Sequence, residues 1–137
     1  MTRLFLDTNT VIGWIADRNP NFRAHGRAAL ARGDTFDVSV IVLHELQFGI
    51  AKSHRKPQSA LALQQFLAGG VSVVPFQDSD ALAAAEIRAA LAAKGTPIGP
   101  YDVLIAGHAR AQNATFVTSN TREFARVPEL ALLDWAK

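Results

Sequence analysis

The fold is indicated by residues 3–16, which read RLFLDTNTVIGWIA. Residues 3–6 form a short apolar run that suits a buried strand, and this run ends at Asp7. Val11, Ile12 and Ile15 then recur at helical spacing, so we expect a helix over residues 8–16. A strand that passes directly into a helix is a repeating unit of parallel sheets, and it places Asp7 at the carboxyl end of the strand.

The same alternation continues along the chain. We expect the first strand at 3–6 and further strands at 37–40, 71–75, 115–118 and 130–133. Helices are expected at 8–16, 21–32, 42–52, 58–67, 78–94 and 101–112, with a single turn at 120–124. Asp78 or Asp80 is the expected cap of the fifth helix, and Gly95 its stop. The pattern predicts a three-layer α/β/α fold with a short central parallel sheet, whose ligands bind beyond the carboxyl ends of the strands.

Composition narrows the class of protein. The 137 residues are enough for one domain, and 49% are hydrophobic against 19% charged, which excludes a disordered chain. With no cysteine, there is no disulfide framework, thiolate zinc site or cysteine nucleophile. No stretch approaches the ~20 apolar residues of a membrane span, so we expect a cytoplasmic protein with no membrane partner.

Basic residues are concentrated in the first half of the chain. The net charge is only +2, but residues 1–70 hold eight basic and five acidic residues. Clustered basic side chains suit either a solvated helix face or a surface that binds phosphates. The candidates for substrate binding are Arg23, Arg27, Lys52 and Arg55.

Three carboxylates lie in apolar surroundings. They are Asp7, Glu45 and Asp102, and helical spacing puts the second and third on faces shared with apolar residues. Burying a lone carboxylate is costly, so each needs a partner. Glu123 follows the strand 115–118 by one turn, so four acids are expected to converge at one edge of the sheet.

Structural roles for these acids remain open at this point. Asp7 can cap the helix that follows it, and Glu123 has the spacing of a capping box with Asn120. Asp102 can cap its own helix or pair with Arg110 or Arg122. Glu45 can pair with Lys52 or with an arginine.

Crowded carboxylates resist joint ionisation, and a bound cation removes the conflict. With oxygen ligands only, we expect Mg²⁺ or Mn²⁺, which can support phosphodiester hydrolysis. Histidine chemistry is not expected, because His44 and His108 lie about 100° and 240° around their helices from the nearest acid. His25 and His54 are expected at the surface.

Four motifs, in this order, resemble those of the PIN-domain ribonucleases, and more narrowly the VapC-type toxins of type II toxin–antitoxin systems. They are residues 4–9 (LFLDTN), 39–45 (SVIVLHE), 97–109 (PIGPYDVLIAGHA) and 117–124 (VTSNTREF). The resemblance spans residues 7–135 and implies a single PIN domain over 1–137. It also implies a Mg²⁺- or Mn²⁺-dependent endoribonuclease that acts on RNA as a toxin.

The resemblance assigns site residues and partners. Asp7, Glu45 and Asp102 match near-invariant acids, Asp7 and Asp102 being the implied metal ligands, and Glu123 matches a fourth acid that is more often Asp. A homodimer is implied, a higher toxin–antitoxin assembly is allowed, and the C-terminal segment of a VapB-type antitoxin occupies the toxin's groove. The alternative is a non-catalytic PIN-like module that binds RNA or protein and holds a structural cation. The supporting polar positions that match are Thr8, Asn9, Thr118 and Asn120.

Overall fold

The computed structural model describes residues 1–137 and contains a five-stranded, all-parallel sheet in the order β3-β2-β1-β4-β5. β1 is the central strand, and Phe5 lies opposite Asp37 on one neighbour and Phe116 on the other. The strands are β1 (Arg3–Leu6), β2 (Thr35–Ser39), β3 (Ser72–Val74), β4 (Thr115–Val117) and β5 (Leu132–Leu133).

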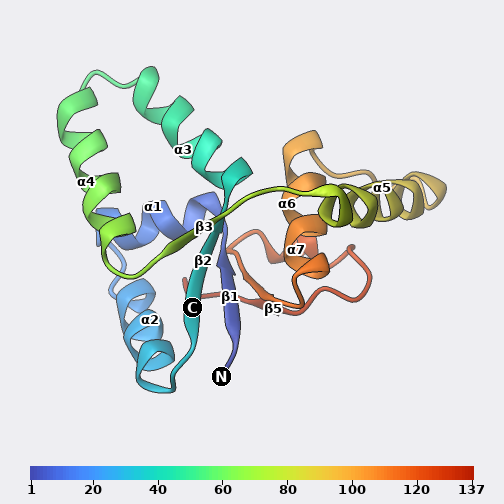
Figure 1. The fold of residues 1–137 in the computed structure, drawn as a ribbon, viewed down its shortest axis with the longest axis horizontal. Helices are drawn as coiled ribbons and strands as arrows, with labels where there is room; N and C mark the ends of the chain where they lie inside the picture. Colours follow the sequence, from blue (N-terminus) through green and yellow to red (C-terminus); the bar gives the residue numbers. More distant parts are fainter.

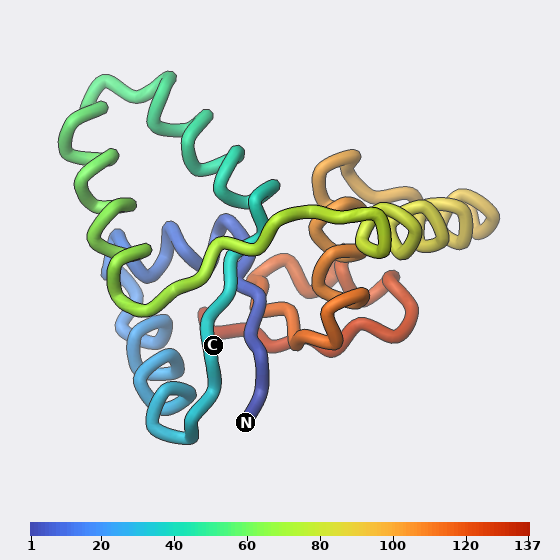
Figure 2. Tube along the Cα trace, in the orientation of Figure 1, coloured from blue at the N-terminus to red at the C-terminus, as the bar shows by residue number.

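Helices cover both faces of this sheet. Figure 1 shows α1, α2 and α4 on one side of the strands and α5 and α6 on the other, as the predicted three-layer fold requires. In the trace of Figure 2, the chain rises along β1 to the end of the sheet where α1 and α3 begin. The helices are α1 (Thr8–Ala16), α2 (Asn21–Ala31), α3 (Val40–Ala51), α4 (Lys56–Ala68), α5 (Asp78–Ala93), α6 (Pro100–Ala111) and α7 (Thr121–Phe124).

The core lies on both faces of the central strands. Leu4, Phe5 and Leu6 are each 1% exposed, because β1 is covered by helices on both sides. α6 also packs closely on α5, since a Cβ added at Gly107 would lie 2.5 Å from the backbone of Ala84. Dense packing therefore holds the backbone of β1, which leads into α1, and the backbone of α6.

Helix starts differ slightly from the sequence prediction. α3 begins at Val40, two residues early, because the Ser39 hydroxyl accepts a hydrogen bond from the Ile41 N–H at 3.1 Å. The N-cap residue of α5 is Gln77 and not Asp78 or Asp80, although Asp80 takes part in the cap as the third residue of a capping box. The Asp80 carboxylate accepts the Gln77 N–H at 2.8 Å. None of the helices combines the length and the apolar character that crossing a bilayer requires.

Candidate active site

Asp7 stands where β1 ends and α1 begins. Its carboxylate accepts a hydrogen bond from the Thr8 N–H at 2.8 Å and another from the Thr118 hydroxyl at 2.8 Å. The first bond caps α1, so the capping role expected from the sequence is confirmed. The second bond joins Asp7 to the residue that follows β4, and Thr118 itself is fully buried. Both oxygens of Asp7 are thereby fixed at the edge of the sheet.

Glu45 reaches the same edge from α3. Its carboxylate accepts a hydrogen bond from the Thr8 hydroxyl at 2.8 Å, so Thr8 contacts two of the four acids. No ion pair includes Glu45, and the alternative of a pair with Lys52 is wrong. The expectation that its helical face is packed holds only in part, since Val42 is buried but Phe48 is 59% exposed.

Asp102 and Glu123 are neighbouring acids, and the charge of Glu123 helps burial to raise the pKa of Asp102. Glu123 accepts the side-chain amide of Asn120 at 2.7 Å and the N–H of Gly99 at 3.2 Å. These contacts replace the capping-box alternative, in which Glu123 would bind the Asn120 backbone. Gly99 caps α6 in place of Asp102, and a Cβ there would lie 3.1 Å from the Asp102 carboxylate. Asp102 forms no ion pair, so the alternative of a pair with Arg110 or Arg122 is also wrong.

Electrostatics link the four acids. Burial, and then the charges of Glu123 and Asp7, raise the pKa of Asp102 to about 7. Burial raises the pKa of Asp7, against the hydrogen bonds from Thr118 and Thr8, and the charges of Glu45 and Glu123 raise it further. The pKa of Glu123 is lowered by its bonds from Asn120 and Gly99, so the proton that the pair shares resides on Asp102.

This donor set fits a divalent cation. It consists of carboxylate oxygens, and its crowded charges would be relieved by a cation. The side chains are nevertheless not drawn together into a ready group of three or more ligands around one point. Binding would therefore need the Asp102 proton to leave and the carboxylates to close around the cation.

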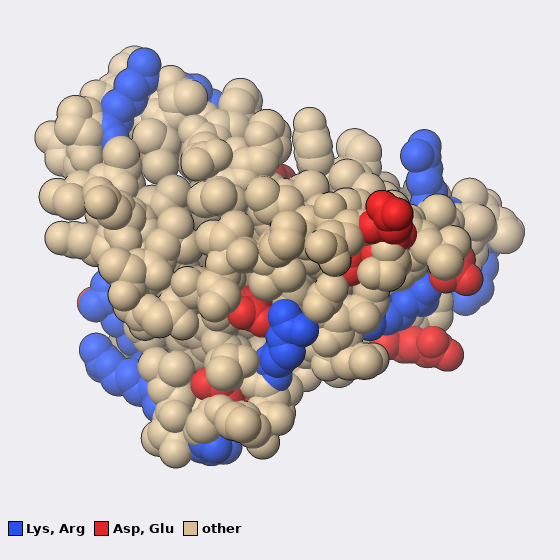
Figure 3. Space-filling model, in the orientation of Figure 1, with Lys and Arg blue, Asp and Glu red and all other residues tan.

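The predicted basic residues do not gather around the acids. Arg23 on α2 donates to the Trp14 carbonyl at 2.9 Å and lies 3.4 Å from Asp17, and Arg27 is exposed on the same helix. Lys52 lies over the ring of Phe48 at 5.0 Å. On the face shown in Figure 3, Lys and Arg side chains are scattered and form no continuous patch.

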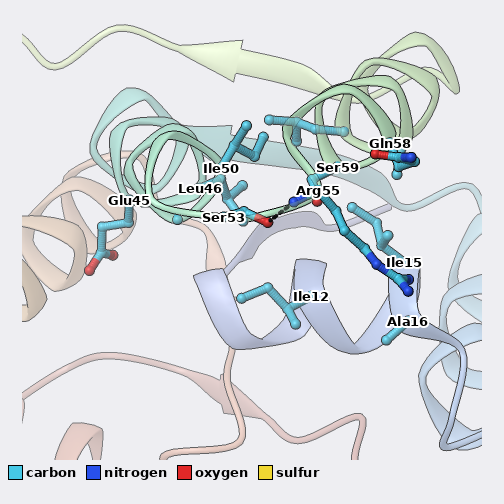
Figure 4. Close-up of a pocket in the computed structure, with 13 residues that line it drawn as sticks. Ile12, Ile15, Ala16, Glu45, Leu46, Ile50, Ser53, Arg55, Gln58 and Ser59 are labelled. Carbon is cyan, nitrogen blue, oxygen red and sulfur yellow. Dashed lines mark hydrogen bonds between the residues drawn. The ribbon is translucent and has the colours of Figure 1, made fainter.

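A groove begins beside Glu45 and runs between α1, α3 and α4. Its volume is about 440 Å³, and Arg55 also lines it. Figure 4 shows Glu45 at one end of the groove, while the side chain of Arg55 extends toward the other end, near Ile15 of α1. Of the predicted basic residues, Arg55 alone shares a cavity with a site acid. The apolar lining is Ile12, Ile15, Ala16, Leu46, Ile50, Ala62 and Leu63.

Sequence reasoning missed two contributors to the site. The N–H of Gly99 binds Glu123, and the charge of Arg126 lowers the pKa of Glu123. The spacing of three residues between Glu123 and Arg126 is a local signal that could have identified the arginine. Asn9 and the exposed Ser119 show no such contact with an acid.

Another buried polar cluster lies apart from the acids. His108 Nδ1 lies 2.7 Å from the Ser39 hydroxyl, and its Nε2 lies 3.5 Å from Asp80. A serine, a histidine and an aspartate in this order suggest nucleophilic catalysis, but all three are at most 1% exposed and Ser39 caps α3. This cluster is structural. Burial lowers the pKa of His108, which keeps the ring neutral.

The PIN domain family matches residues 4–130. Ribonuclease VapC2 of Rickettsia felis is 39% identical over 132 residues, which cover 96% of this chain and 97% of that protein. The tRNA(fMet)-specific endonuclease VapC of Salmonella typhimurium is 38% identical over 135 residues, 98% of this chain and 99% of that protein. The crystal structure of VapBC2 from Rickettsia felis, bound to a DNA fragment from their promoter, aligns with a TM-score of 0.91 and 36% identity over 98% of this chain and 99% of that one.

Proposed function

The chain belongs to the PIN-domain family and, within it, to the VapC ribonucleases, and from this premise we propose that it is the endoribonuclease toxin of a VapBC-type pair. It hydrolyses RNA phosphodiester bonds, and its cognate VapB-type antitoxin neutralises it. We further propose that cleavage depends on Mg²⁺ or Mn²⁺. One observation carries this dependence: burial, and then the negative charges of neighbouring site acids, raise the pKa of Asp7 and of Asp102, and a bound cation would relieve this crowding.

Asp7 and Asp102 would hold the cation, with Glu45 and Glu123 beside them. When bound there, a divalent cation activates a water and neutralises charge that builds on the phosphate. The chain's own donors prepare the site by fixing Asp7 through Thr8 and Thr118, and Glu123 through Asn120 and Gly99. Asp102 has no such donor and holds a proton below about pH 7 in the metal-free protein, so loading of the site below that pH releases the proton.

This chain has a groove that suits the antitoxin. The structures similar to this chain include VapBC complexes from Rickettsia felis and Salmonella typhimurium, which supports a VapB-type partner. We place the C-terminal segment of the antitoxin in the groove between α1, α3 and α4, since its lining is largely apolar. The groove ends at Glu45, so a segment seated there would also obstruct the acids. A homodimer remains a further proposal of the family resemblance.

Cleavage of RNA by the purified chain, free of antitoxin, tests this function. The Salmonella typhimurium relative is named a tRNA(fMet)-specific endonuclease, so tRNA(fMet) is the first substrate to try. We expect cleavage with Mg²⁺ or Mn²⁺, none in EDTA, and none by a folded Asp102→Asn variant. If the wild-type chain binds RNA but cuts none of a broad RNA panel with either metal, the non-catalytic binding module is the correct interpretation.

A further inference from the structure

Two aromatic rings stand beside the acids and bridge the helices that carry them. His44 precedes Glu45 on α3, and Tyr101 precedes Asp102 on α6. The two ring centroids lie 5.7 Å apart, with their planes tilted by 43°. His44 is exposed and Tyr101 is 49% exposed, so the pair presents aromatic surface to solvent.

The fold does not account for this pair. The other aromatic contacts stabilise the interior, as between Phe116 and Phe124 at 4.8 Å, where both rings are at most 1% exposed. Neither His44 nor Tyr101 belongs to the hydrophobic core or packs against it as a partly buried side chain. An exposed tyrosine next to a catalytic carboxylate therefore calls for a role at the site.

We propose that the outer face of Tyr101, supported from behind by His44, is a stacking platform for an unpaired base of the RNA strand. The proposal rests on the proposed ribonuclease function, because a cation held by the acids would bind a phosphate of the same strand. Consecutive residues of a helix are separated by 1.5 Å along its axis and by 100° around it. The ring of Tyr101 therefore points to a different side of α6 from Asp102, but the two Cα atoms are only about 3.8 Å apart, so a strand whose phosphate lies at Asp102 has a neighbouring base within reach of the ring.

The spacing of the rings decides how the base is bound. Stacked bases repeat about every 3.4 Å, so a base inserted between the two rings would need them about 7 Å apart. The observed 5.7 Å is too short, and the base therefore stacks on one exposed face. Every base has a π-face, so the platform selects unpaired over paired nucleotides and does not read sequence.

Binding of a single-stranded RNA that carries the fluorescent base 2-aminopurine tests this platform. Titrations with Mg²⁺ on the Glu45→Gln background, which keeps Asp7 and Asp102 but should not cleave, separate binding from cleavage, and stacking quenches the probe. Tyr101→Ala should weaken binding about tenfold and lose the quenching, within the range for loss of one stacked base. Tyr101→Phe keeps the ring and should bind and quench as the wild type does, whereas Tyr101→Leu keeps only apolar bulk and should behave like Tyr101→Ala.

Controls separate this proposal from the function on which it rests. Leu82→Ala removes a side chain that is 64% exposed on α5 and should leave binding unchanged. If the wild type cleaves RNA but Tyr101→Ala binds and quenches equally well, the platform is refuted and the ribonuclease function stands. If the wild type neither binds nor cleaves RNA, both fail. If Tyr101→Ala instead changes the sedimentation coefficient, the pair is a contact between protein chains and the platform is again refuted.

Discussion

Replacing Asp102 with Asn should stabilise the metal-free protein at pH 8 and stabilise it much less at pH 5. The reason is the crowding of charge around this carboxyl group. Burial and the charges of Glu123 and Asp7 raise its pKa from 3.8 to about 7. Asn has nearly the same shape and cannot ionise, and its amide can still donate to Glu123.

The direction in which pH changes the free energy of unfolding follows from proton binding to Asp102. Between pH 3.8 and about 7 the folded protein keeps a proton on Asp102 that the unfolded chain has released, so the free energy of unfolding falls as pH rises. Above about pH 7 both states are ionised and the loss is complete. A shift of about three pKa units corresponds to about 4 kcal/mol, which we reduce to about 2 kcal/mol because Asp102 is only half-buried and solvent screens its charge.

Thermal unfolding in EDTA at the two pH values measures this effect. At pH 8 the Asp102→Asn variant should melt about 6 °C above the wild type, taking about 3 °C per kcal/mol for a domain of this size. At pH 5 the variant should melt only about 2 °C above the wild type, because about a third of the loss has already occurred between pH 3.8 and pH 5. Glu129→Gln is the matched control, because Glu129 is an exposed acid without an ion pair. A variant that is no more stable than the wild type at pH 8 would refute charge crowding at Asp102.

At pH 8, Mg²⁺ at a hundred times its Kd should stabilise the wild type by up to about 2.7 kcal/mol and so raise its melting temperature. The rise should be smaller for Asp102→Asn. Equal shifts of the two proteins in a Mg²⁺ titration would remove Asp102 from the cation site. If the Lys52 ammonium group binds a phosphate, Lys52→Ala should lower the slope of log RNA affinity against log salt by about 0.7, at a cost in stability of less than about 1 kcal/mol for the lost contact with Phe48. An unchanged slope shows that Lys52 binds no phosphate. Thr118→Val should cost about 1–3 kcal/mol of stability in urea unfolding, because a buried oxygen of Asp7 loses its donor, whereas Thr118→Ser should keep most of it. Equal stability of the two Thr118 variants would contradict that role.

The positions of the acids could be predicted from the sequence because they depend on local order. Asp7 follows an apolar strand directly, so its place at the edge of the sheet is set by its neighbours in the chain. The partners of the acids could not be predicted in the same way. The bond from Thr8 to Glu45 spans 37 residues, and the bond from Gly99 to Glu123 spans 24. Such contacts depend on how the helices pack and have no local signal.

The buried cluster around His108 shows a different failure. Asp80 was interpreted as a cap because it lies in the first turn of its helix. Its spacing from Ala83, Ala84 and Ile87 nevertheless places it on the buried face of α5. The structure shows it fully buried, with hydrogen bonds from Gln77 and Gln112. Asp80 therefore has both roles: it closes the capping box of α5, as its place in the first turn indicated, and it is buried, as the periodicity indicated.

Burial alone therefore does not distinguish a functional carboxylate in this fold, and the nature of its partners does. Asp37 is as buried as Asp7, but Arg3 lies 2.8 Å from it and neutralises its charge. Every ion pair of the structure uses an acid outside the site, and the four site acids contact hydroxyl groups, amides and one another. A carboxylate pair that shares a proton for want of a cation is stable only while that proton is bound. The fold thus leaves uncompensated negative charge at the carboxyl edge of β1 and β4, which is where a divalent cation and a phosphate would meet.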